Sequence, residues 1–482
     1  MACPDTVAES NPRISSDRSS SGDGVRRLSS ARLVVATAAA TALCAVTAGC
    51  TAPKADDPAQ PPSSPTSAAA SSSPAPVTLR FAVYGGPEQV ASYQELAEAF
   101  EKNNPYATVK VESTASAGAS SSRLRTQLAA GTAPDVFLTE HDKVPALVQA
   151  GSVKPVDELL EAREVDFGDG YHRDGLEAFS KDSALQCMPH DVSPMVVYYN
   201  TDLVRFDRLV EPETDPPTAE DGWTWDQFAA AARQIARRGN AHGVHIEPSL
   251  EMLAPFIWSA GGDLVDDTQE PTSLDMDSDD TREAFELVLG LVRDPNVTPT
   301  QAELARQDAV SQFAQGKIGM VIGSRELTPR LRAAKGLDFE VFPLPHIGPF
   351  RTISSMNGYC IAAGTDKVQA AADFLAFAVG REGATITTTA GYVVPSNLEV
   401  AHSPAFTQPG LPPKNSFVFN EGVRRTEPTP FVPEWPRVVN ETDPVIERLF
   451  YAPVIDLDAA LISMDTRSQQ VFVPEDESAE PE

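Results

Sequence analysis

One stretch near the N-terminus alternates strand-like and helix-like patterns, and it restricts the fold more than any other feature. Residues 77–84 alternate apolar and polar side chains, as strands do, and residues 88–104 carry apolar residues on one helical face. A strand at 107–113, a helix at 121–131 and a strand at 134–140 follow. A β-α-β-α-β series builds a sheet flanked by helices, so we expect an α/β fold.

The middle of the chain adds helices with recognisable starts. Residues 224–227 and 300–303 each have Thr followed three residues later by Gln or Glu, which is the capping-box pattern. We expect a helix from each, the second ending near Gly316. Apolar periodicity predicts two more, at 283–294 and 366–380. A chain of 482 residues is long enough for two lobes, each with its own core.

Residues 1–49 have the organisation of a secretory signal peptide. Arg26, Arg27 and Arg32 precede an uncharged apolar run at 33–48 that ends in small residues. This run is too short for a comfortable transmembrane helix. Because the arginine pair is also part of the twin-arginine pattern, both export routes stay open.

Residues 47–50 (Thr-Ala-Gly-Cys) resemble a bacterial lipobox, in which the cysteine is diacylated and becomes the mature N-terminus. Thr47 replaces the usual leucine, so cleavage and release without lipidation is the alternative. Residues 50–76 are rich in Pro, Ser and Ala, which predicts a disordered tether. A tether makes physical sense if Cys50 is lipidated, so we expect a protein anchored on the outer face of the cytoplasmic membrane.

The chain is strongly acidic, with 68 Asp and Glu against 38 Lys and Arg. Removal of residues 1–49 takes away five basic and four acidic residues and leaves 33 against 64. Such a surface repels phosphate backbones, so we expect no nucleic-acid partner. Residues 463–482, which end in PEDESAEPE, are predicted to be a disordered acidic tail.

The cysteines carry no metal or redox pattern. Cys3 and Cys44 leave with the signal peptide and Cys50 is the lipidation site, so Cys187 and Cys360 remain. None has zinc or redox spacing, and we expect no metal and no cofactor.

Short segments along the rest of the chain follow a recognisable order. The first are GGPEQVASYQELAEAFEKNNPYATVKVE (85–112), LAAGTAPDVFLTE (128–140) and MPHDVSPMVVYYNTDLV (188–204). The later ones are at 222–235, 256–267, 313–324, 355–367 and 391–397. Individually loose and jointly specific, these motifs resemble the family 1 extracellular solute-binding proteins, the group that includes maltose-binding protein.

This resemblance implies a two-lobed, periplasmic-binding-protein-like fold. Each lobe is expected to be a mixed, mostly parallel sheet flanked by helices, with 77–189 and 357–405 in the first lobe and 190–356 and 406–462 in the second. The lobes would close over a small-molecule ligand by hinge bending, and ABC transporter permease subunits would accept the closed form. We expect a monomer that is not an enzyme.

A sugar presents hydroxyl groups and apolar faces, so its cleft needs carboxylates or amides together with aromatic platforms. In α/β sheets, ligands gather at the carboxyl ends of strands. The candidate ligand-binding residues are therefore polar and aromatic groups, with close glycines, at strand ends and crossovers. They are Gly86, Glu88, Glu140, Asp142, Asp191, Tyr198, Trp258, Asp263, Arg325, Asn357, Gly358 and Trp435.

Each candidate also has a structural interpretation. Glu88 can complement a helix dipole, Asp191 can satisfy hinge backbone, and Arg325 can form a surface ion pair. Cys187 and Cys360 flank the two crossovers, which lie side by side in this fold, so a disulfide and a pair of buried thiols both stay open.

Other functions and ligands also stay open. A secreted glycoside hydrolase would use carboxylates and aromatics too, but the sequence holds no acidic pair in a recognisable catalytic motif, no nucleophile elbow, no HExxH and no P-loop. A sensor or adhesin lipoprotein is the third interpretation. Among ligands, a mono-, di- or oligosaccharide is preferred, with glycerol phosphates and polyamines as alternatives.

Overall fold

The computed structural model describes residues 75–209 and 216–473. The predicted signal peptide, Cys50, nearly all of the predicted tether and residues 474–482 lie outside the described residues. Within the two described stretches, no helix is both long enough and apolar enough to cross a membrane.

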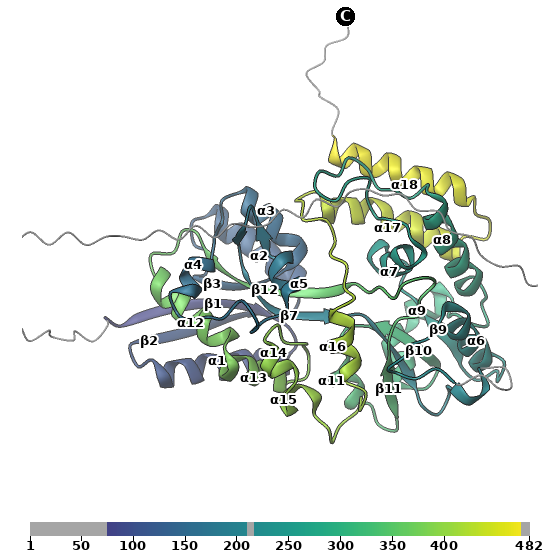
Figure 1. Cartoon of the computed structure of the whole chain (residues 1–482), viewed down its shortest axis with the longest axis horizontal. Coiled ribbons are helices and arrows are strands. Elements are labelled where there is room, and N and C mark those ends of the chain that lie inside the picture. The colour runs from purple at the N-terminus through teal and green to yellow at the C-terminus, as the bar shows by residue number, and fades with distance from the viewer. Residues whose placement is uncertain (1–74, 210–215, 474–482) are drawn as a thin grey trace, which may run out of the picture. The chain divides into compact units, whose positions relative to one another are not determined.

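The first sheet contains the strands that the N-terminal pattern predicted. Its strands β1 and β2 pair in parallel, as do β1 and β3. Strand β12 then runs antiparallel to β3, β4 and β7, so the order is β2-β1-β3-β12-β4. Strand β7 lies beside β12 (Figure 1). The strands are β1 (Val77–Tyr84), β2 (Ala107–Thr114), β3 (Val136–Glu140), β4 (Val153–Lys154), β7 (Met188–Pro194) and β12 (Ser354–Ala362).

The second sheet has the order β11-β8-β10-β9. Strand β8 is antiparallel to β10 and β11, and only β10 and β9 are parallel. Both sheets are mixed, as expected, but antiparallel pairs are more frequent than expected because the chain changes direction where it passes between lobes. The strands are β8 (Val196–Asn200), β9 (His242–His245), β10 (Ile318–Gly323) and β11 (Phe339–Phe342), and a small hairpin joins β5 (Ser180–Lys181) to β6 (Ala184–Leu185).

Helices flank the first sheet. Helix α1 packs on β2, and α12 packs on β12 and β1. The helices of this lobe are α1 (Pro87–Asn103), α2 (Ala117–Ala129), α3 (Val144–Gln149), α4 (Asp157–Glu161), α5 (Arg173–Ala178), α12 (Val368–Val379), α13 (Arg381–Thr389), α14 (Leu398–Ala401) and α15 (Pro404–Thr407), with the 3-10 turn η1 (His141–Lys143).

Helices also flank the second sheet, with α6 against β9 and α10 against β10, while α17 pairs with α18 and α7 with α8. The prediction that residues 463–472 belong to a disordered tail is wrong, because they lie in α18, which buried Leu461, Met464 and Val471 hold against the core. The helices are α6 (Trp225–Ala236), α7 (Leu250–Ala260), α8 (Asp279–Val292), α9 (Gln301–Arg306), α10 (Ala309–Ala314), α11 (Leu327–Arg332), α16 (Phe417–Val423), α17 (Trp435–Tyr451) and α18 (Leu457–Phe472), with the 3-10 turn η2 (Phe206–Arg208).

Both predicted capping boxes are present. The Thr224 side chain accepts from the backbone N–H of Gln227, whose side chain accepts from the Thr224 N–H, and the pair at α9 does the same. The single helix expected up to Gly316 is wrong, however. Asp308 accepts from the N–H of Ser311 at 2.9 Å and starts α10 as a separate helix.

The chain passes between the sheets on two neighbouring strands. Strand β7 leads into β8 with only Met195 between them, and β12 runs antiparallel beside β7 (Figure 1). A disulfide joins Cys187 to Cys360 across this pair, with their Cα atoms 4.5 Å apart. The structure therefore shows the bridge rather than two buried thiols.

Candidate functional site

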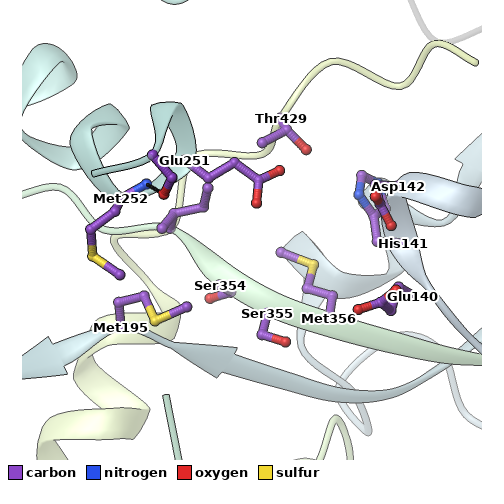
Figure 2. Close-up of a pocket in the computed structure, with 12 residues that line it drawn as sticks. Glu140, His141, Asp142, Met195, Glu251, Met252, Ser354, Ser355, Met356 and Thr429 are labelled. Atoms are coloured by element: carbon purple, nitrogen blue, oxygen red, sulfur yellow. Dashed lines mark hydrogen bonds between the residues drawn. The ribbon is translucent and has the colours of Figure 1, made fainter. Parts of the chain in front are cut away.

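A cavity of about 290 Å³ is lined by both lobes. The first lobe contributes Glu140, His141 and Asp142, which follow β3 directly. The second lobe contributes Glu251 and its neighbours at the start of α7. Figure 2 shows Glu251 and His141 on opposite sides of the cavity, with residues of β12 between them. The other lining residues are Met195, Ser249, Met252, Ile353, Ser354, Ser355, Met356 and Thr429.

A larger cavity of about 1010 Å³ shares His141, Met356 and Thr429 with the smaller one. Because the two share walls, we treat them as one interlobe cleft. The larger part is lined by residues 174–182 from the first lobe and by 258–269 and 426–431, among others. Trp258 and Phe431 supply aromatic surface there, as a sugar-binding cleft requires.

The smaller cavity is rich in carboxylates. Burial, together with the charges of Asp142, Glu251 and Glu326, raises the pKa of Glu140 to about 7, although the charge of Lys143 acts in the opposite direction. Burial also raises the pKa of Glu251, although Trp435 Nε1 donates to its Oε1 at 3.2 Å. Lys143 Nζ lies 2.5 Å from Asp142 Oδ2, so this cation is paired with that carboxylate.

His141 presents an acceptor to the cleft. Its side chain is only 7% exposed, and Nε2 lies 2.9 Å from the carbonyl oxygen of Ala178. A carbonyl can only accept, so Nε2 carries the proton. Burial lowers the pKa of His141, which keeps the ring neutral and leaves Nδ1 with a free lone pair.

A hydrogen-bonded network lies next to the cleft, where the two crossing strands meet. Tyr84 Oη donates to Asn357 Oδ1, and Asn357 Nδ2 donates to Asp191 Oδ1 at 3.0 Å. Ser193 Oγ donates to the other Asp191 oxygen at 3.0 Å. Asp191 is 1% exposed, and burial raises its pKa to about 7. Asp191 therefore braces the crossing strands and does not line either cavity, whereas Asn357 is only partly buried.

Arg325 is buried, contrary to both interpretations of it from the sequence, and its neighbour Glu326 is the exposed residue. Arg325 is 0% exposed, and its guanidinium donates to the Phe406 carbonyl at 3.0 Å and lies 4.7 Å from the Phe406 ring centroid. Arg325 therefore neither lines the cleft nor forms a surface ion pair. Glu326 is exposed, and its charge raises the pKa of Glu140, Tyr84 and Tyr392, so it lies near the cleft.

The cleft brings together four of the candidate residues, namely Glu140 and Asp142 from the first lobe and Trp258 and Asp263 from the second. Gly86 and Glu88 line neither cavity. Glu88 instead accepts a hydrogen bond from Tyr392 Oη at 3.3 Å on the exposed surface.

Three other candidate ligand-binding residues are buried in the protein core and do not line either cavity. Tyr198 is 0% exposed and donates to the Ser324 carbonyl at 2.9 Å, because β8 is a central strand. Trp435 is 0% exposed and supports Glu251 through Nε1 instead of offering a stacking face. Gly358 is a packing glycine, since a Cβ there would lie 2.5 Å from the Phe179 ring.

Sequence reasoning missed Glu251, Glu326 and the methionines of the smaller cavity, Met195, Met252 and Met356. A signal existed for Glu251, because Ser249 caps α7 and places a carboxylate in its first turn. Within the described part of the chain, no cluster of His, Cys, Asp and Glu could hold a metal ion.

Known proteins share sequence with this chain. The model of the bacterial extracellular solute-binding protein family matches residues 95–413. A predicted binding protein of Brucella abortus (strain 2308) is 25% identical over 264 residues, 52% of this chain and 59% of the relative. A maltotriose-binding protein of Pyrococcus abyssi is 22% identical over 262 residues, 54% of this chain and 52% of the relative. The chain thus spans about half to three fifths of the length of these curated relatives.

Solved structures match over most of the chain. An ABC substrate-binding protein from Listeria monocytogenes in complex with cycloalternan has a TM-score of 0.71 at 23% identity, over 82% of this chain and 99% of the other. The GacH receptor of Streptomyces glaucescens, solved unliganded and with acarbose, has a TM-score of 0.69 at 19% identity, over 82% and 98%. This likeness concerns the fold, which is the two-lobed α/β fold expected from the motifs.

Proposed function

Because the chain belongs to the bacterial extracellular solute-binding protein family, we propose that it captures a small carbohydrate and delivers it to an ABC importer. The observation that carries this proposal is the continuous cleft lined by residues of both lobes. The ligands named for similar proteins, cycloalternan, acarbose and maltotriose, support a carbohydrate as the ligand class.

The chemistry of the cleft suits a mono-, di- or oligosaccharide. Carboxylates such as Glu140 and Asp263 accept hydrogen bonds from sugar hydroxyls. Trp258 and Phe431 offer apolar surface to the C–H faces of a sugar ring. The larger cavity, about 1010 Å³, has the volume of a site for a ligand of several rings.

Capture is proposed to proceed by hinge closure. The first lobe, 77–189 with 357–405, and the second, 190–356 with 406–462, would approach each other around the crossing strands. A ligand drives closure only through contacts that are better in the closed form, and groups from opposite lobes supply such contacts. A diacylated Cys50 and the tether behind it would hold a monomeric binding protein at the outer face of the cytoplasmic membrane, beside the permease.

A thermal-shift screen of the purified chain against saccharides, polyols, glycerol phosphates and polyamines tests this proposal. We expect a saccharide to raise the melting temperature, with one-to-one binding by calorimetry. Stabilisation by glycerol phosphates alone, or by none of these solutes, would contradict it.

The two other functions have their own signatures. Release of reducing sugar from an oligosaccharide without stabilisation of the protein would indicate a glycoside hydrolase. Normal sugar uptake in a deletion strain, together with saccharide binding by the purified chain, would indicate a sensor or adhesin.

A further inference from the structure

The charged side chains that line the smaller cavity of the cleft are all acidic. Glu140, Asp142 and Glu251 contribute carboxylates, and no Lys or Arg lines this cavity. The Ser249 hydroxyl accepts from the N–H of Met252, and Ser354 Oγ is bonded to Thr426 Oγ1. The hydroxyls of Ser249, Ser355 and Thr429 can donate as well as accept, but every charged group in the lining is an acceptor, so a charged ligand group placed here must be a cation that donates hydrogen bonds.

The positive charges nearest to these carboxylates are already paired. Lys143 is held by Asp142, and Arg351 Nε lies 2.8 Å from Glu427 in the larger cavity. Within the described residues, no ion pair involves Glu140 or Glu251. Burial and the charges of Asp142, Glu251 and Glu326 raise the pKa of Glu140, and the nearby charge of Lys143, which is paired with Asp142, offsets this only in part.

His141 supplies an independent observation. It is 7% exposed, its Nδ1 has no hydrogen-bond partner among the described residues, and its side chain lines both cavities. Because Nε2 donates to the Ala178 carbonyl, Nδ1 is an acceptor whose partner has to come from a ligand or from solvent. A nearly buried acceptor thus faces the same space as the carboxylates of both lobes.

We infer that the smaller cavity binds an ammonium group, and that the solute is an amine-bearing saccharide. This inference rests on the proposed function and narrows its ligand class. An ammonium has three donors and no acceptor, which matches the acceptors that converge here. The thioethers of Met195, Met252 and Met356 line the rest of the wall with soft, adaptable surface.

An ammonium group bound between the lobes would also stabilise the closed form. Glu140 belongs to the first lobe and Glu251 to the second, and the negative charge of Glu251 contributes to the raised pKa of Glu140. Closure over a neutral sugar would bring these charges together in a less hydrated space, where they repel more strongly. An ammonium between them turns this repulsion into attraction that exists only in the closed form.

The residues that line the larger cavity suit a saccharide better than an alkyl polyamine. Trp258 and Phe431 line it together with polar groups such as Asp263 and Gln269. Rings with hydroxyl groups use both kinds of surface, whereas an alkyl polyamine leaves the hydroxyl-binding groups unsatisfied.

Calorimetry with matched ligands tests the inference. The titrants are the glucosamine disaccharide chitobiose, its N-acetylated counterpart, maltose and spermidine. We expect chitobiose to bind at least about tenfold more tightly than the other three, the gain typical of a charge-assisted hydrogen bond. Glu140→Gln and Glu251→Gln should each remove about tenfold of this affinity, because glutamine keeps an acceptor oxygen and loses the charge.

Glu98→Gln is the matched control, since Glu98 is exposed on α1 and undergoes the same change of charge. It should leave the affinity for chitobiose unchanged. Equal or tighter binding of maltose or the acetylated sugar would overturn the inference and leave the proposed function standing. Binding of spermidine alone would overturn both, whereas binding of none of the four would overturn the inference and leave the proposed function to the wider saccharide screen. Circular dichroism of each variant establishes that it is folded.

Discussion

Asn357 donates a hydrogen bond from Nδ2 to Asp191 Oδ1 at 3.0 Å, and this bond ties together the two strands that run between the lobes. The disulfide joins Cys360, in one of these strands, to Cys187, the residue just before the other strand. Because the hydrogen bond and the disulfide both link β12 to β7 or to the residue just before it, we expect this strand pair to be rigid. We therefore expect hinge bending beyond them, around Met195 and Ile353, where the chain passes between the sheets.

The disulfide is expected to stabilise the protein by about 2–5 kcal/mol, because it closes a loop between residues 173 apart in sequence. Reductant should lower the melting temperature of the wild-type chain. The double variant Cys187→Ser, Cys360→Ser should start lower and be insensitive to reductant. If the wild-type protein is treated with reductant while unfolded and its melting temperature after refolding is unchanged, the result would contradict the disulfide.

Trp258 and Trp223 are expected to separate binding from stability. Trp258 lines the cleft and is only partly buried, so Trp258→Ala should weaken saccharide binding about tenfold and change the melting temperature little. Trp223 is 1% exposed and donates to the Pro343 carbonyl at 2.9 Å. Trp223→Ala should cost about 3–5 kcal/mol of stability. Calorimetry measures binding and chemical denaturation measures stability for both variants. Unchanged saccharide affinity in Trp258→Ala would contradict the assignment of this cleft as the binding site.

Arg325 is a buried cation without a carboxylate partner among the described residues, and burial lowers its pKa to about 10. Arg325→Ala should destabilise the protein by about 2–4 kcal/mol, because it leaves a cavity and an unpaired Phe406 carbonyl. Arg325→Met fills the same space and should cost less than ~1.5 kcal/mol. Denaturant titration measures both, and saccharide affinity should be unchanged in each. A loss of saccharide affinity in a folded Arg325→Met protein would instead indicate that Arg325 contributes to ligand binding.

The stability of the ligand-free protein should fall as pH rises. The pKa of Glu140 is raised from 4.5 to about 7 in the folded protein, so the folded state binds more protons than the unfolded chain between these values. Stability from this group is therefore present at low pH and is lost as pH rises through about 7. Buried Asp191, whose pKa is also raised to about 7, acts in the same direction.

Glu140→Gln isolates the contribution of this one carboxylate. Melting temperatures at pH 5 and pH 8, taken at about 0.15 M salt to screen surface charge, should fall less in the variant than in the wild type. The difference should correspond to about 1–3 kcal/mol. Equal falls in both proteins would show that Glu140 titrates normally.

Much of the fold could be predicted from local sequence patterns. The N-terminal alternation gave the parallel pairs β1·β2 and β1·β3, and two Thr-x-x-Gln/Glu patterns marked the starts of α6 and α9. These signals lie within a few residues and act through local hydrogen bonds. The antiparallel return of β12 could not be predicted from local patterns, because it depends on pairing with strands more than 150 residues away.

The site was predictable only in part, because sequence indicates a strand end but not the direction of each side chain beyond it. Glu140 and Asp142 follow β3, as that rule requires, and line the smaller cavity, whereas Trp258 and Asp263 line the larger one from the end of a helix, α7, and not from the end of a strand. At the end of β10 the rule selected Arg325, which turns inward to Phe406, and overlooked its neighbour Glu326. Trp435 was mistaken for a platform because only tertiary packing shows that its Nε1 meets Glu251.

Calorimetric titration of the intact chain with a saccharide panel tests the central claim, that the interlobe cleft captures a carbohydrate. The account predicts one-to-one binding of at least one saccharide, weakened by Trp258→Ala. No binding of any neutral or amine-bearing saccharide by a folded protein would contradict it.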